Sequence, residues 1–281
     1  MNAVIKDVAN FFHDSKLELF SILPFDKMRI INQSKFERRT IQNPKSVIII
    51  ALPYFTGRTE ETNISLYAHS KDYHLFFSDF FKTAKKYFEE KFKGYSFEGY
   101  ADNSFIDERY GAVISGIGVF GENGTVITKE YGSYVFLGEI ITDMPTEDFY
   151  EGGAFGMDTD FKHCIKCGRC KTHCPIYKGE CSECLSMITQ KKGELSCNEI
   201  DLMVKYNTVW GCDICQDVCP MNSNIKTTPV DFFYENRINK VSSDIINSMN
   251  DEEFSSRAFA WRGRKTILRN TDIYQGCKKE K

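Results

Sequence analysis

The first 163 residues contain no cysteine, and the whole chain lacks a long apolar run. Its longest apolar stretch, Val47 to Leu52, is far shorter than the roughly 20 residues needed to cross a bilayer. The N-terminal segment carries Asp7, Asp14 and Glu18, whereas a secretion signal has an uncharged apolar core. We therefore expect no membrane span, no secretion signal and a cytoplasmic protein.

Neither sign of charge predominates, since the chain has 36 Lys and Arg residues, 39 Asp and Glu residues and a formal net charge of −3. No overall basic field predicts a nucleic-acid partner, so only a local basic patch could provide one. The chain nevertheless has 11 cysteines. Because cytosolic thiols stay reduced, metal binding explains them better than disulfides do.

Strand and helix signals alternate in the cysteine-free part. Residues 46–55 have the continuous apolar pattern of a buried strand, and residues 72–92 repeat aromatic side chains at helical spacing. Residues 112–120 and 134–141 are β-branched and interrupted by glycine, which favours strands close to a ligand or a tight turn. This alternation predicts an α/β (α+β) layered domain.

The C-terminal part predicts a helix over residues 251–269, with acidic residues in its first turn and basic residues later. Five basic residues and no acidic residue fall within 257–269. A solvated helix face is the simpler interpretation of this basic run, and contact with phosphates is the alternative.

Ten of the 11 cysteines lie between residues 164 and 219, beyond a glycine-rich stretch at 151–156 that marks a domain boundary. The first motif, C-x2-C-x2-C-x3-C-P, consists of Cys164, Cys167, Cys170, Cys174 and Pro175. This run is typical of bacterial ferredoxins with two [4Fe-4S] clusters, in which the fourth thiolate reaches the second cluster. A second motif repeats the spacing with Cys212, Cys215, Cys219 and Pro220, but Val209 stands where a further thiolate would be.

Two such clusters need eight protein thiolates, and the two motifs supply seven. The candidates for the eighth are Cys181, Cys184 and Cys197. Exchange of the last cysteine of each motif assigns one cluster to Cys164, Cys167, Cys170 and Cys219. The other cluster takes one of the three candidates together with Cys174, Cys212 and Cys215. A structural zinc site is the alternative, but the near-duplication of the run favours clusters. Cys277 is expected to be uninvolved.

Several stretches, in one consistent order, resemble the epoxyqueuosine reductase family. One is the segment Trp210-Gly-Cys-Asp-Ile-Cys-Gln-Asp-Val-Cys-Pro-Met-Asn222 around the second cysteine motif. The others are Pro44 to Leu52, Tyr67-Ala68 with Asp72-Tyr73-His74, Asp102 through Glu108-Arg109, Gly116 to Gly121 with Asn123, Gly132 to Asp143, and Phe259 to Asn270. Where the family usually has GWIGK, this chain reads Gly118-Val-Phe-Gly-Glu122.

The resemblance implies three parts: a nitroreductase-like α/β domain over residues 1–157 that binds cobalamin, a ferredoxin-like domain with two [4Fe-4S] clusters over 158–225, and a short helical C-terminal extension over 226–281. It implies reduction of epoxyqueuosine in tRNA to queuosine. The expected partners are the tRNA anticodon region and an electron donor. The sequence has no counterpart of the family's helical-repeat domain, so a weaker grip on tRNA is expected.

By matching position, Asp102 would be the proton donor and Cys184 the eighth thiolate. The residues implied to line the cofactor or substrate pocket are Tyr67, Asp72, Tyr73, His74, Arg109, Gly118 and Asn123. A carboxylic acid donates a proton near neutral pH only if burial raises its pKa. Since Asp102 lies in sequence between Tyr100 and Phe105, we expect such burial. Without the resemblance, Asp102 would be interpreted as a turn or cap residue.

Two other functions fit the cysteine motifs. One is a ferredoxin-like electron-transfer protein, and the other is a corrinoid reductase that acts on a small molecule. The sequence contains no D-x-H-x-x-G corrinoid motif, so cobalamin would be bound without that motif's histidine ligand. Cobalt content and salt-sensitive binding of tRNA would separate these functions.

Overall fold

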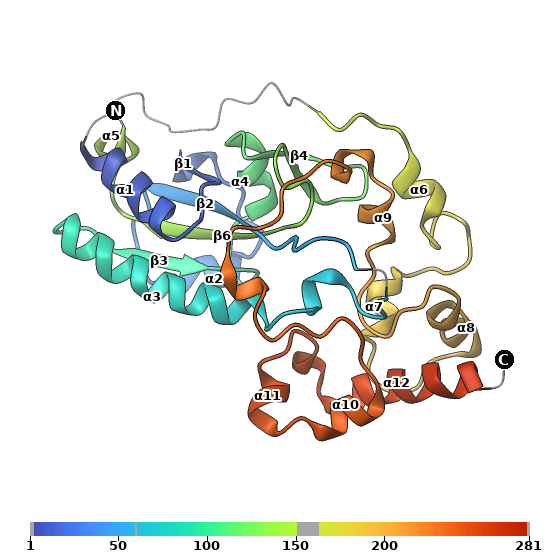
Figure 1. The fold of residues 1–281 in the computed structure, drawn as a ribbon. Coiled ribbons are helices and arrows are strands. Elements are labelled where there is room, and N and C mark those ends of the chain that lie inside the picture. The colour runs from blue at the N-terminus through green and yellow to red at the C-terminus, as the bar shows by residue number, and fades with distance from the viewer. Residues whose placement is uncertain (1–2, 60, 151–162, 280–281) are drawn as a thin grey trace. The chain divides into compact units, whose positions relative to one another are not determined.

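The computed structural model describes residues 3–59, 61–150 and 163–279. Its chain forms two compact units (Figure 1), the first from Met1–Tyr54 and His74–Lys166, the second from Phe55–Tyr73 and Cys167–Lys281. The predicted boundary after residue 157 and the glycine-rich stretch at 151–156 lie outside the described residues. The three-part division stays a prediction. The cysteine-rich segment from Cys167 onward and the C-terminal extension fall within one unit, whereas Cys164 belongs to the other.

A four-stranded antiparallel sheet forms the centre of the first unit, in the order β1-β2-β6-β3. Its strands are β1 (Phe20–Pro24), β2 (Ser46–Pro53), β3 (Phe97–Tyr100) and β6 (Val135–Thr142). A separate antiparallel pair consists of β4 (Gly118–Phe120) and β5 (Val126–Thr128). Every residue of β2 is buried, which confirms the strand predicted from its continuous apolar pattern.

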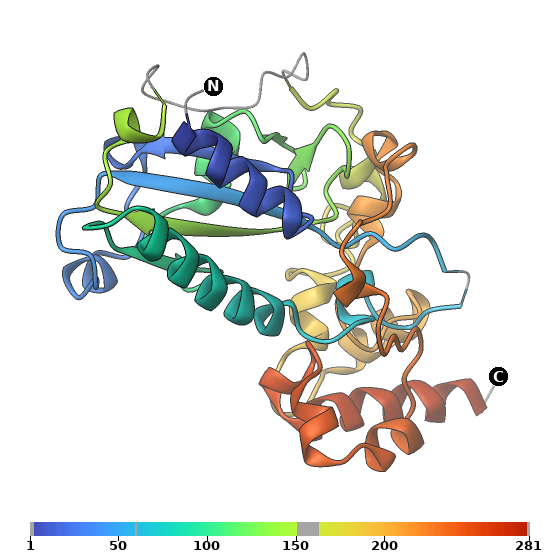
Figure 2. The same cartoon turned by 60° about the vertical axis from the view of Figure 1, so that its left-hand side comes forward.

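Helices cover both faces of this sheet, as Figure 2 shows. The helical segments of the first unit are α1 (Ala3–Asp14), η1 (Phe25–Lys27), α2 (Gln33–Glu37), α3 (Tyr73–Lys91), α4 (Glu108–Ile114) and α5 (Thr146–Phe149). Helix α3 approaches closely because Phe77 lies where Gly138 has no side chain. Helix α4 packs on the opposite face, where a Cβ atom at Gly111 would lie 2.8 Å from Ile49 Cδ1.

Two of the predicted strands and the long aromatic helix are confirmed, but residues 112–120 are not one strand. Ala112 belongs to α4, and only Gly118–Phe120 is extended. The helix begins because the side chain of Asp107 accepts a hydrogen bond from the backbone N–H of Tyr110 at 3.1 Å. This cap outweighs the β-branched composition of the segment.

The second unit consists of short helices and connecting segments. They are η2 (Leu66–Ala68), α6 (Arg169–His173), α7 (Leu185–Thr189), α8 (Cys197–Lys205), α9 (Ile214–Asp217), η3 (Pro220–Asn222), η4 (Asp231–Phe233), α10 (Ser243–Ser248), α11 (Asp251–Ser255), η5 (Ala260–Arg262) and α12 (Arg264–Lys279). Trp210 is fully buried in its core and packs edge-on against Phe259, with ring centroids 6.2 Å apart.

The predicted single helix over residues 251–269 is wrong. The segment is divided into α11, η5 and the first part of α12. Gly263 has φ 87°, a left-handed conformation that a helix interior excludes, and it separates η5 from α12.

Most of the basic run within 257–269 binds the protein itself. Arg257 is only 4% exposed and donates to the carbonyl of Asn236 at 2.6 Å. Arg264 donates to the carbonyls of Ile246 and Met249, the latter at 3.1 Å. Arg257 thus donates to the Asn236 carbonyl and Arg264 to carbonyls in and just after α10, so neither guanidinium is placed for contact with phosphates.

Within the part of the chain that the structure describes, no helix combines the length and the apolar character of a membrane span.

Candidate active site and cysteine-rich region

Asp102 lies in a tight turn directly after β3. Its backbone has φ 58°, and the N–H of Asn103 donates to the carbonyl of Ala101 at 2.7 Å. A three-residue turn of this kind with a positive central φ is a γ-turn, which is rare and strained. The ammonium group of Lys35 donates to the carbonyl of Asn103 at 3.1 Å and fixes the turn from its other side. Strain held in this way motivates a functional interpretation of Asp102.

The Asp102 carboxyl faces His74 at the beginning of α3. Asp102 Oδ2 lies 3.5 Å from His74 Nε2, and the two side chains are 54% and 51% exposed. The expected burial of Asp102 among apolar groups is therefore wrong. Phe105 is buried and Tyr100 packs against the same core cluster, while the γ-turn between them directs the Asp102 carboxyl outward.

Two carboxyl groups, one fully buried and one half-buried, lie behind the Asp102 turn. Glu139 of β6 is 0% exposed, and the carboxyl of Glu108 in the first turn of α4 faces it. Burial, together with the neighbouring Asp102 carboxyl, raises the pKa of Glu108 to about 8. Burial, together with the facing Glu108 carboxyl, raises the pKa of Glu139 well above its usual range. The backbone N–H of Asp102 donates to the Glu108 carboxyl, so the pair is linked directly to the turn.

The remaining predicted residues of the first unit gather around the turn between β4 and β5. The guanidinium of Arg109 donates to the carbonyl of Gly124 at 3.3 Å. The side chain of Asn123 accepts from the backbone N–H and the hydroxyl of Thr125, at 3.3 and 2.9 Å. A Cβ atom at Gly118 would lie 2.6 Å from the carbonyl oxygen of Ile127, so strand packing alone explains this glycine.

Tyr67, Asp72 and Tyr73 lie in the segment that the second unit takes from the N-terminal half of the chain. Burial raises the pKa of the Tyr67 hydroxyl, which keeps its proton and contacts Trp210. The backbone N–H of Asp72 donates to the carbonyl of Ser256 at 2.8 Å, just before Tyr73 begins α3.

The residues around the second cysteine motif are held by the same segment. The Asp213 carboxylate accepts from the Ser65 hydroxyl and, at 2.6 Å, from the backbone N–H of Leu66. Gly211 has φ 74°, and a side chain there would collide with Ser65. Together with the buried Trp210, these contacts explain the local sequence Trp-Gly-Cys-Asp as the support of Cys212.

Five thiols of the second unit lie close enough to influence one another. Burial raises the pKa of Cys212 to about 12, and the nearby thiols of Cys184 and Cys215 add to this effect. Burial also raises the pKa of Cys181, which lies near Cys174 and Cys184. Within the described ranges, no three Cys, His, Asp or Glu side chains converge on the position of a single metal ion.

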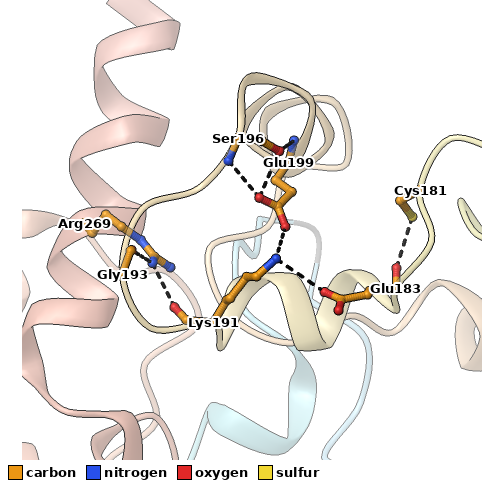
Figure 3. A network of polar contacts seen from close by, with 7 residues as sticks. All are labelled: Cys181, Glu183, Lys191, Gly193, Ser196, Glu199 and Arg269. Atoms are coloured by element: carbon orange, nitrogen blue, oxygen red, sulfur yellow. Dashed lines mark hydrogen bonds and ion pairs between the residues drawn. The ribbon is translucent and has the colours of Figure 1, made fainter.

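Figure 3 shows the polar network that fixes the segment between Cys181 and α8. Lys191 Nζ lies 2.7 Å from Glu199 Oε1 and 3.6 Å from Glu183 Oε2. The Cys181 thiol donates to the carbonyl of Glu183 at 3.1 Å. Arg269 of α12 donates to the carbonyl of Lys191 at 2.8 Å and so connects the C-terminal helix to this loop.

The positions of the three candidates for the eighth thiolate differ in this region. Ser196 and Glu199 form a capping box that starts α8, and Cys197 is the exposed first residue of that helix. Cys184 immediately precedes α7 and lies near Cys212. The structure thus brings Cys184, with Cys181 beside it, to the second motif. Cys164 belongs to the first unit and Cys167 begins the second segment of the other unit.

Sequence reasoning missed the buried acid pair. Its signal is present in the sequence, because Glu139 is the only charged residue of an otherwise apolar strand, Val135–Thr142. Glu108 is part of the Glu-Arg pair that resembles the family, and the resemblance implies no separate role for it. The network around Lys191 left no such signal, since it joins residues that are far apart in the chain.

A half-exposed carboxyl in a strained turn of one unit and a group of thiols in the other are features of a redox enzyme. The family model described as "Epoxyqueuosine reductase QueG, DUF1730" matches residues 37–103. The curated epoxyqueuosine reductase of Atelocyanobacterium thalassa is 32% identical over 245 residues, 78% of this chain and 76% of that protein. The chain belongs to the epoxyqueuosine reductase family, whose members are oxidoreductases.

Solved structures show the same fold. The epoxyqueuosine reductase of Streptococcus thermophilus superposes with a TM-score of 0.73 at 24% identity, covering 98% of this chain and 81% of that one. An epoxyqueuosine reductase bound to an epoxyqueuosine-modified tRNA-Tyr stem loop has a TM-score of 0.73 at 21% identity, covering 97% of this chain and 81% of that one.

Proposed function

We propose that this protein reduces the epoxide of epoxyqueuosine in tRNA to the alkene of queuosine, with Asp102 as the proton donor. The γ-turn that presents the Asp102 carboxyl beside His74 is the observation that carries the proposal. Membership of the family supplies the substrate, and the tRNA stem loop bound by a relative of the same fold supports the anticodon region as the part recognised.

The spacing and proximity of the thiols favour the binding of two [4Fe-4S] clusters. One would be held by Cys164, Cys167, Cys170 and Cys219, and the other by Cys174, Cys184, Cys212 and Cys215. A cubane is larger than a single ion and each of its irons takes one thiolate, so its ligands need not converge on one point. The proximity of Cys174, Cys184, Cys212 and Cys215 fits this donor set. The second unit would then be the ferredoxin-like part.

Cobalamin would be held in a nitroreductase-like first unit. A corrinoid carries amide groups on its rim, and the polar groups of His74, Arg109 and the turn at Asn123 offer matching hydrogen-bond donors and acceptors. When bound, the corrinoid would supply the low-potential cobalt chemistry that opens the epoxide. Tyr67, Asp72 and Tyr73 stay proposed lining residues.

The protein's own residues must deliver the protons that the reaction consumes. Conversion of an epoxide to an alkene breaks two C–O bonds, forms one C=C bond, consumes two electrons and two protons, and releases water. An electron donor would supply the electrons through the clusters. The Asp102 carboxyl, half-exposed and held in a fixed turn, would pass to the departing oxygen a proton that it takes up from solvent or from a neighbouring acid.

The test is an anaerobic assay of cobalamin-loaded protein on an epoxyqueuosine-containing anticodon stem loop with a strong reductant. We expect conversion by the wild type and a loss of roughly 10²–10⁴-fold in turnover for Asp102→Asn, because an amide cannot supply the acidic proton. Asp79→Asn, an exposed change on α3, is the matched control and should retain full turnover. Equal rates for Asp102→Asn and the wild type would remove Asp102 from the mechanism. Absence of any conversion by the wild type would favour an electron carrier.

A further inference from the structure

We propose that Glu108 and Glu139 form a buried proton reservoir that reprotonates Asp102 within each turnover. This inference rests on the proposed function, because it concerns the second of the two protons that the reaction consumes. Asp102 has a single carboxyl group and can deliver one proton at a time. A second acid close to the Asp102 turn is therefore required, unless the proton arrives from solvent.

The fold places the two carboxyl groups against each other. Glu139 lies in β6 between β2 and β3, opposite Ile49 on one side and Tyr100 on the other. Strand alternation directs it to the face that α4 covers, together with Ile49. The close approach of Gly111 to Ile49 brings the first turn of α4, and with it Glu108, over this part of the sheet.

Burial forces this pair to hold a proton. In the part of the chain that the structure describes, neither carboxyl oxygen of Glu139, nor Oε2 of Glu108, has a hydrogen-bond partner of good geometry. Two ionised carboxylates in such a place would be buried, like in charge and short of donors, which costs far more than protonation of one of them. A protonated carboxyl can donate to its neighbour, so one shared proton satisfies both groups.

Other groups around the pair leave this outcome unchanged. The Asp102 and Asp107 carboxyls add negative charge near Glu108, and Tyr100 is neutral because burial raises its pKa. The Ser104 hydroxyl favours the ionised form of Glu139, but burial and the facing Glu108 outweigh it. The Lys85 ammonium, which lies near Tyr100, is paired with Glu98 at 2.7 Å.

The pair is also connected to the group it would serve. The backbone N–H of Asp102 donates to the Glu108 carboxyl, so Glu108 lies directly behind the strained turn. In the proposed step the shared proton leaves the pair and reaches the Asp102 carboxylate, either directly or through one water molecule. The pair becomes more negative by one charge and recovers its proton from solvent after the product leaves. No electron moves in this step.

Infrared spectroscopy of the full-length protein tests the shared proton without any turnover. The wild type should show the carbonyl stretch of a protonated carboxylic acid at neutral pH, since the pKa of Glu108 is about 8. Glu139→Gln should abolish this band, because the Gln amide would donate to Glu108 and allow it to ionise. Glu98→Gln, which removes an ion-paired carboxylate on β3, is the matched control and should keep the band.

Turnover of the cobalamin-loaded enzyme tests whether the pair reprotonates Asp102. We expect wild-type kcat to fall as pH rises above about 8, because the Glu108 carboxyl, whose pKa is about 8, then ionises. Glu139→Gln should lower kcat roughly tenfold with KM unchanged, and a small buffer acid should restore the rate by replacing the reservoir. Should Glu139→Gln fail to fold, Glu108→Gln provides the same test at the half-buried member of the pair.

The outcomes separate the two proposals. A wild type that converts stem loop, with a Glu139→Gln variant of equal kcat, pH profile and infrared band, overturns the reservoir and leaves the proposed function standing. A low rate in Glu139→Gln that no buffer acid restores also overturns it, because the pair would then be only structural. A wild type that converts no stem loop overturns the proposed function and the reservoir with it.

Discussion

A single carboxyl group cannot be both accessible to substrate and protonated near neutral pH. Asp102 has the first property, and the pair Glu108 and Glu139 has the second. A side chain that reaches substrate must be accessible, and Asp102 is 54% exposed. A carboxyl that keeps its proton near neutral pH must be buried, and Glu139 is 0% exposed. The γ-turn at Asp102 lies between these environments, which explains why a strained backbone occurs at this position.

The eighth thiolate is the prediction that belongs to single residues. Cys184→Ala should lose the iron of one cluster, about four of eight atoms per chain, because Cys184 lies near Cys212 and precedes a fixed helix. Cys197→Ala should keep full iron, since Cys197 is exposed at the start of α8. Iron analysis of anaerobically purified variants measures this, with Cys277→Ala as the control.

A reversal of that pattern would change the assignment. If Cys184→Ala retains all its iron and Cys181→Ala loses half, then Cys181 is the ligand and its bond to the carbonyl of Glu183 must break when the cluster binds.

At the scale of elements, short contacts made by glycine determine how helices meet the sheet and the cysteine loops. Gly111 lets α4 approach β2, and Gly211 lets the second cysteine motif approach Ser65. Gly263 ends η5 and gives α12 its own direction. The basic residues of 257–269 are consequently distributed over η5, α12 and the segment before η5, and they have different surroundings.

Arg264 and Lys265 should therefore behave differently when replaced by Ala. Arg264→Ala should destabilise the second unit by roughly 1–3 kcal/mol, because the carbonyls of Ile246 and Met249 lose their donor. Lys265 is exposed, and Arg262 stacks on the exposed Trp261 with 3.8 Å between its Cζ and the ring centroid. If these two residues contact tRNA phosphates, each change to Ala should flatten the log–log salt dependence of stem-loop binding by about 0.7–0.9.

Filter binding across a salt series, with urea unfolding in parallel, distinguishes the two effects. If Arg264→Ala lowers the salt dependence of stem-loop binding but leaves the stability to urea unchanged, then Arg264 does not act chiefly as a donor to the carbonyls of Ile246 and Met249. An unchanged slope for the double change of Arg262 and Lys265 would remove the basic run from tRNA binding.

At the scale of the whole molecule, the two units contain buried titratable groups of opposite pH dependence. Glu108 in the first unit has a raised pKa of about 8 and prefers its neutral form. His69 in the second unit also prefers its neutral form, because burial lowers its pKa to about 4. Its Nε2 lies 3.0 Å from Thr62 Oγ1, and the guanidinium of Arg237 lies 3.4 Å from its Nδ1.

His69 should make the second unit sensitive to acid. Above pH 6.5 the histidine is neutral in both the folded and the unfolded chain, so its stabilising contacts are fully present. As pH falls from 6.5 towards 4, the unfolded chain binds a proton that the folded chain excludes, and stability decreases. Between neutral pH and about pH 5 we expect a loss of about 2 kcal/mol.

Tryptophan fluorescence reports this effect selectively, because both tryptophans, Trp210 and Trp261, belong to the second unit. As pH is lowered, the urea midpoint measured anaerobically should decrease in the wild type. It should decrease less steeply in His69→Gln. Parallel curves for the two proteins would show that His69 does not carry the acid sensitivity.

The sequence by itself determined the features that depend on local pattern and spacing. The apolar run at 46–55 predicted a buried strand, the aromatic repeat at 72–92 predicted α3, and the ordered motifs identified the family. These succeed because strand and helix periodicity and motif order are properties of neighbouring residues.

Only the tertiary structure decided which residues meet across long separations. It showed that Asp102 is exposed by a γ-turn, that Glu108 and Glu139 share a buried site, and that Arg257 and Arg264 bind carbonyls instead of standing free. It also brought Cys184, rather than Cys197, close to Cys212. Burial and the meeting of like charges shift a pKa only after packing has removed water, so no local pattern of residues could have revealed them.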